Sequence, residues 1–341
     1  MKALVVEPGR AGARVEDMPD TVVGIDEVPV RVLEVGVCGT DREIVHGLFG
    51  IAPEGEELLV LGHEALGVVE RDGHGFSRGD LVSATVRRSC GHCLACEEAS
   101  PDSCLTGNYS ERGITRLHGF ARELVGEDPA QLVPIPRDLR RVGVLAEPLS
   151  DCVRAMRHAR AIGGRQPWEL QRALVIGAGA IGTLVTFLLR LDGVAVVTMA
   201  LEPARPLIEE TGAEYVPAGS GDLGRFDLVV ECAGNAQLMA DALGLLRRSG
   251  VACLLGIDGR EQKVELDGRT IGVDAVLENR VLFGSVNARR EDWVAGIAAL
   301  DEMRRRWPGV LDQLIGLRVP LDRFDEALAF AGGKATLALS D

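Results

Sequence analysis

The sequence predicts an α/β protein in which a β-rich domain precedes a doubly wound parallel sheet. Residues 1–150 contain short β-rich runs separated by turns rich in Gly and Asp. From residue 173 onward, short apolar runs alternate with helical segments. Those runs lack polar alternation, which is typical of strands that are buried on both faces of a sheet.

The chain is expected to form two domains. In the first, residues 1–150, strands are expected at 29–37 and 65–70, and a helix at 149–162 marks the boundary. The second domain, 151–289, is predicted to contain strands at 173–177, 194–200, 227–234, 251–257 and 281–287, with helices at 180–191 and 204–213. A further amphipathic helix and a last strand, within about 290–341, are expected to complete the first domain.

Composition argues against several classes of function. The net charge is −14, whereas a broad nucleic-acid surface needs clustered Lys and Arg. The longest apolar runs are shorter than the ~20 residues that a membrane-spanning helix needs. The first apolar run ends at Pro8-Gly9 and does not resemble a secretory signal. We therefore expect a cytoplasmic protein that binds neither nucleic acid nor membranes.

A glycine-rich motif opens the second domain. Its residues include Gly177, Gly179, Ala180, Ile181 and Gly182, which complete a G-x-G-x-x-G pattern between a predicted strand and a predicted helix. This is the context of a dinucleotide-binding Rossmann fold, where the helix start binds the pyrophosphate. A glycine-rich turn without a ligand is the alternative.

The residues after the second strand of this domain bear on the choice of cofactor. An acidic residue is expected there to bind the ribose hydroxyls, and Glu202 lies twenty residues after Gly182. A carboxylate repels a 2′-phosphate, so Glu202 favours NAD. Arg205 follows and could instead accept the phosphate of NADP. The chain is thus expected to use NAD or NADP, with NAD slightly favoured.

Four of the eight cysteines lie within fifteen residues. Cys90, Cys93, Cys96 and Cys104 have the spacing C-x2-C-x2-C-x7-C. Four thiolates so placed can close a tetrahedral zinc site, which leaves no position for substrate and therefore stabilises the fold. An iron–sulfur cluster is the rival interpretation. We call residues 90–104 the cysteine lobe.

A second metal site is predicted from more distant residues. Cys38 follows a predicted strand, His63 follows another, and Glu147 precedes the helix at 149–162. Each residue alone is more often a core or surface group. Together they offer a thiolate, an imidazole and a carboxylate, and three protein ligands with one free position are typical of a catalytic zinc. We call Cys38, His63 and Glu147 the open site.

The order of these motifs resembles the zinc-containing medium-chain dehydrogenase/reductase family over essentially the whole chain. Segments 108–120, 145–152 and 284–293 resemble its glucose 1-dehydrogenase branch. The resemblance implies a GroES-like β domain beside a Rossmann domain, and dimers or tetramers that form through the Rossmann sheet edge. It also implies Cys38 and His63 as zinc ligands.

The resemblance assigns further roles. Glu147 would be the third zinc ligand, and Glu64 an alternate ligand during turnover. Thr40 would take part in a proton relay beside the reacting hydroxyl. Asp41 would accept a hydrogen bond from the ring of His63 and fix its tautomer.

The implied substrate contacts come from several segments. Glu111, Asp151 and Asn287 would bind sugar hydroxyls, together with Thr40 and Glu147, and Asn287 is expected to contact the cofactor as well. Carboxylates and amides suit a polyol, because each lost hydrogen bond weakens binding. The expected reaction is therefore oxidation of an aldose at its anomeric carbon to the lactone.

Departures and alternatives remain at this point. Simple alcohol dehydrogenases carry a relay His two residues after the metal-motif Asp, where this chain has Glu43; His46 is a possible substitute. Another zinc polyol dehydrogenase, of the sorbitol, galactitol or threonine type, would use nearly the same ligands. A non-catalytic nucleotide-binding protein and a zinc-free quinone reductase are disfavoured by the cysteine and histidine motifs.

Overall fold

The computed structural model describes residues 1–339, which divide into two compact units. Unit 1 comprises Met1–Ser150, Asn287–Asp301 and the chain from Ile315 onward. Unit 2 comprises Asp151–Val286 and Glu302–Leu314. The α/β fold class predicted from the sequence is confirmed, because unit 1 is dominated by antiparallel strands and unit 2 by a parallel sheet.

The strands of unit 1 form three sheets. They are β1 (Lys2–Val6), β2 (Arg14–Asp17), β3 (Val28–Val37), β4 (Leu59–Val60), β5 (Glu64–Val69), β6 (Leu81–Ala84), β7 (Arg87–Arg88), β8 (Ser110–Arg112), β9 (Arg116–Leu117), β10 (Leu124–Glu127), β11 (Leu132–Ile135), β18 (Ile315–Pro320) and β19 (Lys334–Ala338). The largest sheet has the order β11-β6-β5-β3-β19-β18, with β10 also paired to β3. The smaller sheets have the orders β2-β1-β4 and β7-β8-β9.

Strand β3 is the centre of the largest sheet. Its apolar side chains pack with those of β5, β6, β10 and β11 in one buried core cluster that includes Val30, Val32 and Phe120. The last strand, β19, pairs antiparallel with β3, so that Ala335 lies opposite Val37. The end of the chain thereby reaches the residues that directly precede Cys38.

The helices of unit 1 are short. They are α1 (Gly39–Val45), α2 (Leu94–Glu97), η1 (Pro101–Ser103), η2 (Arg137–Leu139), η3 (Gly143–Leu145), η6 (Leu321–Arg323) and α10 (Phe324–Ala329). Two longer helices, α3 (Ala146–Gly163) and α8 (Arg290–Arg306), begin in unit 1 and continue into unit 2.

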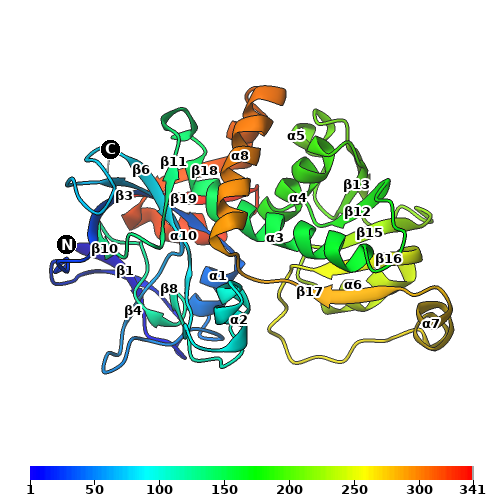
Figure 1. Ribbon diagram of the computed structural model, residues 1–341, viewed down its shortest axis with the longest axis horizontal. Coiled ribbons are helices and arrows are strands. Elements are labelled where there is room, and N and C mark those ends of the chain that lie inside the picture. The colour runs from blue at the N-terminus through cyan, green and yellow to red at the C-terminus, as the bar shows by residue number, and fades with distance from the viewer. Residues whose placement is uncertain (340–341) are drawn as a thin grey trace. The chain divides into compact units, whose positions relative to one another are not determined.

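Unit 2 is built on a parallel sheet with the order β14-β13-β12-β15-β16-β17 (Figure 1). Its strands are β12 (Arg172–Ile176), β13 (Ala195–Ala200), β14 (Glu214–Pro217), β15 (Phe226–Glu231), β16 (Leu246–Leu254) and β17 (Val281–Gly284). The chain winds outward from β12 in one direction and then from β15 in the other. Ligands of such sheets bind outside the carboxyl ends of the strands at this reversal point.

The remaining helices of unit 2 are α4 (Ala180–Leu191), α5 (Pro206–Glu209), α6 (Ala236–Asp241), η4 (Ala242–Leu245), η5 (Thr270–Asp274), α7 (Ala275–Leu277) and α9 (Val310–Leu314). Helix α5 is shorter than the predicted 204–213. It begins at Pro206, whose fixed φ suits a first helical position, and the chain turns at Gly212 with a φ of +80°. Within residues 1–339, no helix has the length and apolarity needed to cross a membrane.

Candidate functional site

The open site forms at the junction of strand β3 with helix α1. Cys38 leaves the strand as the N-cap of α1, and its backbone N–H donates to Asp41 Oδ2 at 2.8 Å. His63 enters from the turn before β5, where Gly62 adopts a φ of +90°. Cys38 Sγ lies 3.2 Å from His63 Nε2. The two side chains therefore present their ligand atoms to the same point.

Asp41 lies behind the imidazole. Its Oδ1 is 3.5 Å from His63 Nδ1, which is an ion-pair distance rather than a good hydrogen bond. Both atoms are buried and have no other hydrogen-bond partner among residues 1–339. A neutral His63 that uses Nε2 as a ligand would carry its proton on Nδ1, facing this carboxylate.

The pKa values of Cys38 and His63 reflect burial and the charges of neighbouring groups. Burial raises the pKa of the Cys38 thiol and outweighs the opposing effect of His63. Burial by itself would lower the pKa of His63, but Cys38 and Asp41 raise it well above its usual value. A coordinated divalent cation deprotonates a thiol and holds imidazole neutral. A thiol and an imidazole are both common zinc ligands, and the ligand atoms of this pair lie close enough together to share one ion.

Two carboxylates complete the surroundings of His63. Ligand atoms of His63, Glu64 and Glu147 all lie within 4.8 Å of one another, and all three residues are buried. Glu147 is in the first turn of α3. The ligand atoms of Cys38, Asp41 and His63 form an overlapping group of the same size. The structure therefore gathers every residue that the sequence analysis placed around the catalytic metal, apart from Thr40, a half-buried residue in the first turn of α1.

Lys334 is a member of this site that sequence reasoning missed. Its Nζ lies 2.6 and 2.5 Å from the two carboxylate oxygens of Glu64, and both side chains are 2% exposed. Burial lowers the pKa of Lys334, but the charges of Glu64 and Cys38 outweigh that effect and raise it. One signal was available: this is one of only three lysines, and it stands at the start of an apolar run.

The position of Glu64 depends on a glycine in the neighbouring strand. Gly36 lies opposite Glu64 in the β3–β5 pairing. A Cβ atom built on Gly36 would lie 2.0 Å from Glu64 Oε2. Only glycine at position 36 therefore allows the Glu64 carboxylate to occupy its place beside Lys334.

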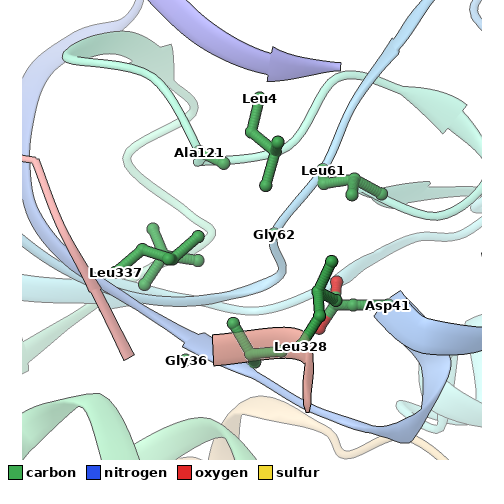
Figure 2. A pocket seen from close by; sticks show the side chains of 10 residues that line it. Leu4, Gly36, Asp41, Leu61, Gly62, Ala121, Leu328 and Leu337 are labelled. Carbon is green, nitrogen blue, oxygen red and sulfur yellow. The ribbon is translucent and has the colours of Figure 1, made fainter. Parts of the chain in front are cut away.

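A small apolar pocket lies next to Asp41 (Figure 2). Figure 2 shows Leu4, Leu61, Ala121 and Leu337 around it, with Gly62 at its wall. Its lining offers no polar group apart from Asp41 and backbone atoms. It belongs to the core packing that supports the site and not to a substrate-binding surface.

Two predicted sugar-binding residues also meet in unit 1. Asn287 Nδ2 donates to Glu111 Oε1 at 3.1 Å, and Asn287 Oδ1 accepts from the backbone N–H of Ala288 at 2.8 Å. Asn287 has a φ of +68°, a left-handed conformation that Asn tolerates better than most residues. Asp151 follows Glu147 by four residues along α3, which places them on one face of that helix.

The cysteine lobe brings its four thiols together. The Sγ–Sγ distances are 3.5 Å for Cys93–Cys96, 3.9 Å for Cys90–Cys96 and 4.0 Å for Cys93–Cys104. Zn–S bonds of about 2.3 Å in a tetrahedron require about 3.8 Å between sulfurs. The distances therefore fit a four-thiolate metal site and are far from the ~2.05 Å of a disulfide.

The thiols of the lobe differ in pKa: burial raises the pKa of Cys96 to about 11, whereas two other thiols have a lowered pKa. A hydrogen bond from Thr106 is the main cause of a lowered pKa at both Cys90, where it falls to about 5, and Cys104. His92 is exposed, and its Nδ1 contacts the Cys90 carbonyl at 2.7 Å. His92 is therefore outside the group of ligand atoms, as the four cysteines alone predict.

The glycine-rich motif of unit 2 has the steric properties of a phosphate-binding turn. Gly177 follows β12 with a φ of +102°. A Cβ on Gly182 would lie 1.9 Å from the Gly177 carbonyl oxygen, so the helix α4 can approach the strand only with glycine there. A Cβ on Gly179 would meet nothing within 4 Å, which leaves its backbone open to a ligand.

Glu202 and Arg205 lie beside this turn. Glu202 is exposed just beyond β13, and its carbonyl accepts from the Tyr215 hydroxyl at 2.9 Å. Arg205 Nη1 donates to the Ala178 carbonyl of the glycine-rich turn at 2.7 Å. Burial lowers the pKa of Arg205. A carboxylate and a guanidinium thus both border the region where the ribose of a dinucleotide would bind.

Comparison with known proteins identifies the family. Residues 24–137 match the alcohol dehydrogenase GroES-like domain, and residues 140–337 match the glucose dehydrogenase C-terminus. The chain is 40% identical to the glucose 1-dehydrogenase of Methanocella arvoryzae, with 96% of each chain covered. It is 40% identical to that of Thermoproteus tenax, covering 96% of this chain and 95% of the relative.

A solved structure agrees with these matches. The glucose dehydrogenase of Haloferax mediterranei, in complex with NADP, Zn and gluconolactone, superposes with a TM-score of 0.92, at 31% identity and 100% coverage of both chains. This chain therefore belongs to the zinc-containing medium-chain dehydrogenase/reductase family and is similar to its glucose 1-dehydrogenases.

Proposed function

We propose that this protein is a zinc-dependent glucose or aldose 1-dehydrogenase, which oxidises the anomeric hydroxyl to the lactone with NAD or NADP as the hydride acceptor. The observation that carries the proposal is that two groups of ligand atoms share His63: Cys38, Asp41 and His63 form one group, and His63, Glu64 and Glu147 form the other. In the same unit, a carboxylate and an amide meet at Glu111 and Asn287. The full-length similarity to glucose 1-dehydrogenases supports the substrate class.

The open site has the donor set of a catalytic zinc. Cys38, His63 and Glu147 would hold the ion, which when bound lowers the pKa of the substrate hydroxyl by its Lewis acidity. Asp41 keeps the imidazole oriented, and the unpartnered buried atoms Asp41 Oδ1 and His63 Nδ1 fit that role. The Cys90, Cys93, Cys96 and Cys104 thiols would hold a second, structural zinc.

Other residues of the chain bind and orient the sugar and its proton. We assign Glu111, Asn287 and Asp151 to sugar hydroxyls and Thr40 to the proton relay beside the reacting hydroxyl. Glu64, which is paired with Lys334, lies beside the open site. We assign it as an alternate zinc ligand, because its carboxylate lies within 4.8 Å of the ligand atoms of His63 and Glu147.

Unit 1 is proposed to be the catalytic domain and unit 2 the nucleotide-binding domain. The glycine-rich turn from Gly177 to Gly182 would bind the pyrophosphate, and Ala180 and Ile181 begin the helix whose N–H groups face it. Glu202 favours NAD, whereas Arg205 offers a partner for the 2′-phosphate of NADP. The exposed position of Glu202 leaves its side chain free to turn toward the ribose or away from it.

The decisive experiment is an initial-rate panel of aldoses, polyols, threonine and simple alcohols with NAD and NADP, each with and without a chelator. Activity on aldoses that the chelator abolishes is the expected result. Activity on sorbitol, galactitol or threonine alone would change the proposed substrate class but would agree with the proposed zinc chemistry. No activity on any compound, with zinc in only the cysteine lobe, would favour a non-catalytic nucleotide-binding protein.

A matched pair of variants tests the choice of cofactor. Glu202→Gln removes the charge that opposes a 2′-phosphate, and the ratio of kcat/KM for NADP to that for NAD should rise by about tenfold. Arg205→Gln should lower the same ratio. If neither ratio changes, neither residue lies near the 2′-position of the bound cofactor.

We further propose a cytoplasmic homo-oligomer that associates along β17. This strand is the edge of the parallel sheet, and Leu282 on it is 41% exposed. Nearby Val276 and Leu277 are 68% and 66% exposed. An exposed apolar edge favours pairing with a second copy. Sedimentation velocity should give a dimer or tetramer, and Leu282→Glu should shift it to a smaller species.

A further inference from the structure

Arg87 is a buried cation directly beside a proposed substrate contact. It lies on β7, and the pairing of β7 with β8 places it opposite Glu111. Arg87 Nε and Nη2 lie 3.0 and 2.9 Å from the same oxygen, Glu111 Oε1. The two side chains are 10% and 11% exposed. Because solvent is largely excluded, this ion pair constrains Glu111 more than an exposed pair would.

The two carboxylate oxygens of Glu111 have different contacts. Asn287 Nδ2 donates to Oε1 as well, so that three N–H groups converge on that oxygen. Within residues 1–339, no donor contacts Oε2. With Oε1 saturated by protein, Oε2 is the oxygen that remains to accept a hydrogen bond from a ligand hydroxyl.

The other side of the guanidinium is held by the region of the cysteine lobe. Arg87 Nη1 donates to the Asp102 carbonyl at 2.5 Å, and Asp102 lies between Cys96 and Cys104. The guanidinium carbon lies 4.0 Å from the centre of the Tyr109 ring. Arg87 is thereby fixed from two directions that do not involve Glu111. Only a planar guanidinium can satisfy all three partners at once, and an ammonium cannot.

We propose that Arg87 is a positioning residue for sugar binding: it holds Glu111 Oε1 so that Oε2 faces the sugar, and it takes its own orientation from the Asp102 carbonyl and the Tyr109 ring. This inference rests on the proposed function, since it requires Glu111 to bind a sugar hydroxyl. The competing explanation is an ion pair that only stabilises the fold.

The test is a double-mutant cycle of Arg87→Lys and Glu111→Gln, with Arg88→Lys as the matched control. Arg88 is the next residue along β7, but its Nη2 pairs with Glu127 Oε2 at 2.8 Å instead. Each variant is measured for KM of glucose, KM of the nicotinamide cofactor, kcat, zinc content and thermal midpoint. Binding of gluconolactone is measured separately by calorimetry, so that sugar affinity has a readout besides turnover.

Arg87→Lys is expected to raise the KM for glucose and the Kd for gluconolactone by about tenfold, as for one lost charge-assisted hydrogen bond. The KM for the cofactor and the zinc content should stay unchanged. In the Glu111→Gln background, Arg87→Lys should add less than about twofold, because the two residues act through one contact. Arg88→Lys should lower the thermal midpoint without changing the KM for glucose.

The outcomes distinguish the proposed sugar contact of Glu111 from the proposed positioning role of Arg87. If Glu111→Gln leaves both sugar constants unchanged, the sugar contact assigned under the proposed function is wrong. If Glu111→Gln weakens sugar binding but Arg87→Lys does not, the contact stands and the positioning role of Arg87 is wrong. Equal effects of Arg87→Lys in both backgrounds, or a change matched by Arg88→Lys, would show a general effect on the fold.

Discussion

The open site and the cysteine lobe are two candidate metal sites built in opposite ways. The lobe takes four ligands from fifteen consecutive residues, and none of the four is buried. The proposed ligands of the open site come from positions 38, 63 and 147, and buried charged groups such as Asp41 and Lys334 lie close by. Its geometry exists only when the β3 sheet has formed.

This difference separates two uses of the same ligand chemistry. In the lobe, four thiolates satisfy a cation completely, so that the site can contribute only folding energy. In the open site, the three proposed ligands would leave a fourth position for a reacting group. We therefore expect the folded sheet to maintain the open site, and we expect the lobe to depend on a bound metal for its local order. Removal of ligands should therefore affect activity in one case and stability in the other.

The largest effect is expected at Cys38. Cys38→Ser removes a thiolate ligand, and kcat should fall by at least about a thousandfold because Lewis-acid catalysis supplies several kcal/mol. Bound zinc should fall from two ions per chain to one, measured by elemental analysis. Cys152→Ala, which alters a buried cysteine in unit 2, is the control and should retain both ions. A Cys38→Ser protein with two zinc ions and full turnover would contradict the assignment of the open site as the catalytic metal site.

Cys93→Ser in the lobe should act mainly on stability. Loss of one of four ligands releases the structural metal, and the thermal midpoint should fall by at least about 10 °C. The turnover of the protein that remains folded should change far less than in Cys38→Ser. Calorimetry and a zinc assay at low temperature measure both quantities. A large loss of turnover without loss of stability would contradict the structural role.

The pairing of Lys334 with Glu64 gives the next effect. Lys334→Met leaves a buried carboxylate without its partner, which is expected to lower the free energy of unfolding by about 3–5 kcal/mol. Glu64→Gln in the same chain should restore much of that loss, because both charges are then removed. Denaturant unfolding of the two single variants and the double variant measures the coupling. If the losses in the free energy of unfolding of the two single variants simply add in the double variant, the ion pair makes no net contribution to stability.

The smallest effect is expected at His92, in the lobe. His92→Asn should leave the zinc content and turnover unchanged and shift the thermal midpoint by less than about 2 °C, as for an exposed substitution. Its Nδ1 contacts the Cys90 carbonyl rather than a ligand atom. Loss of lobe zinc in this variant would instead place His92 in the coordination shell and weaken the four-thiolate assignment.

The sequence predicts most of what depends on local spacing. The cysteine lobe and the glycine-rich turn follow from residues that are close in the chain, and the parallel sheet follows from apolar runs. The family, and with it the fold class of both domains, is confirmed by the comparisons. The short strand β14 was not predicted, because its segment, residues 214–217, is too short and mixed to stand out.

Contacts between distant segments could not be predicted from one sequence. Lys334 reaches Glu64 only because β19 pairs with β3, across nearly the whole chain. The contact of Asn287 with Glu111 likewise joins residues far apart in the chain. Spacing carries no information about such pairs. A buried lysine can be suspected from its apolar neighbours, but its partner cannot.

The absence of a side chain at position 36 has a consequence for how this protein can vary. Even a methyl group there would displace the Glu64 carboxylate, which is 2.0 Å from that point. In a saturation library at this codon selected for turnover, we expect glycine to survive almost alone, although the residue touches no substrate. Another codon of the same strand, such as that of Arg31, whose side chain is 38% exposed, should tolerate exchange. Variation at position 36 of β3 is thus limited by the Glu64 carboxylate on the neighbouring strand β5.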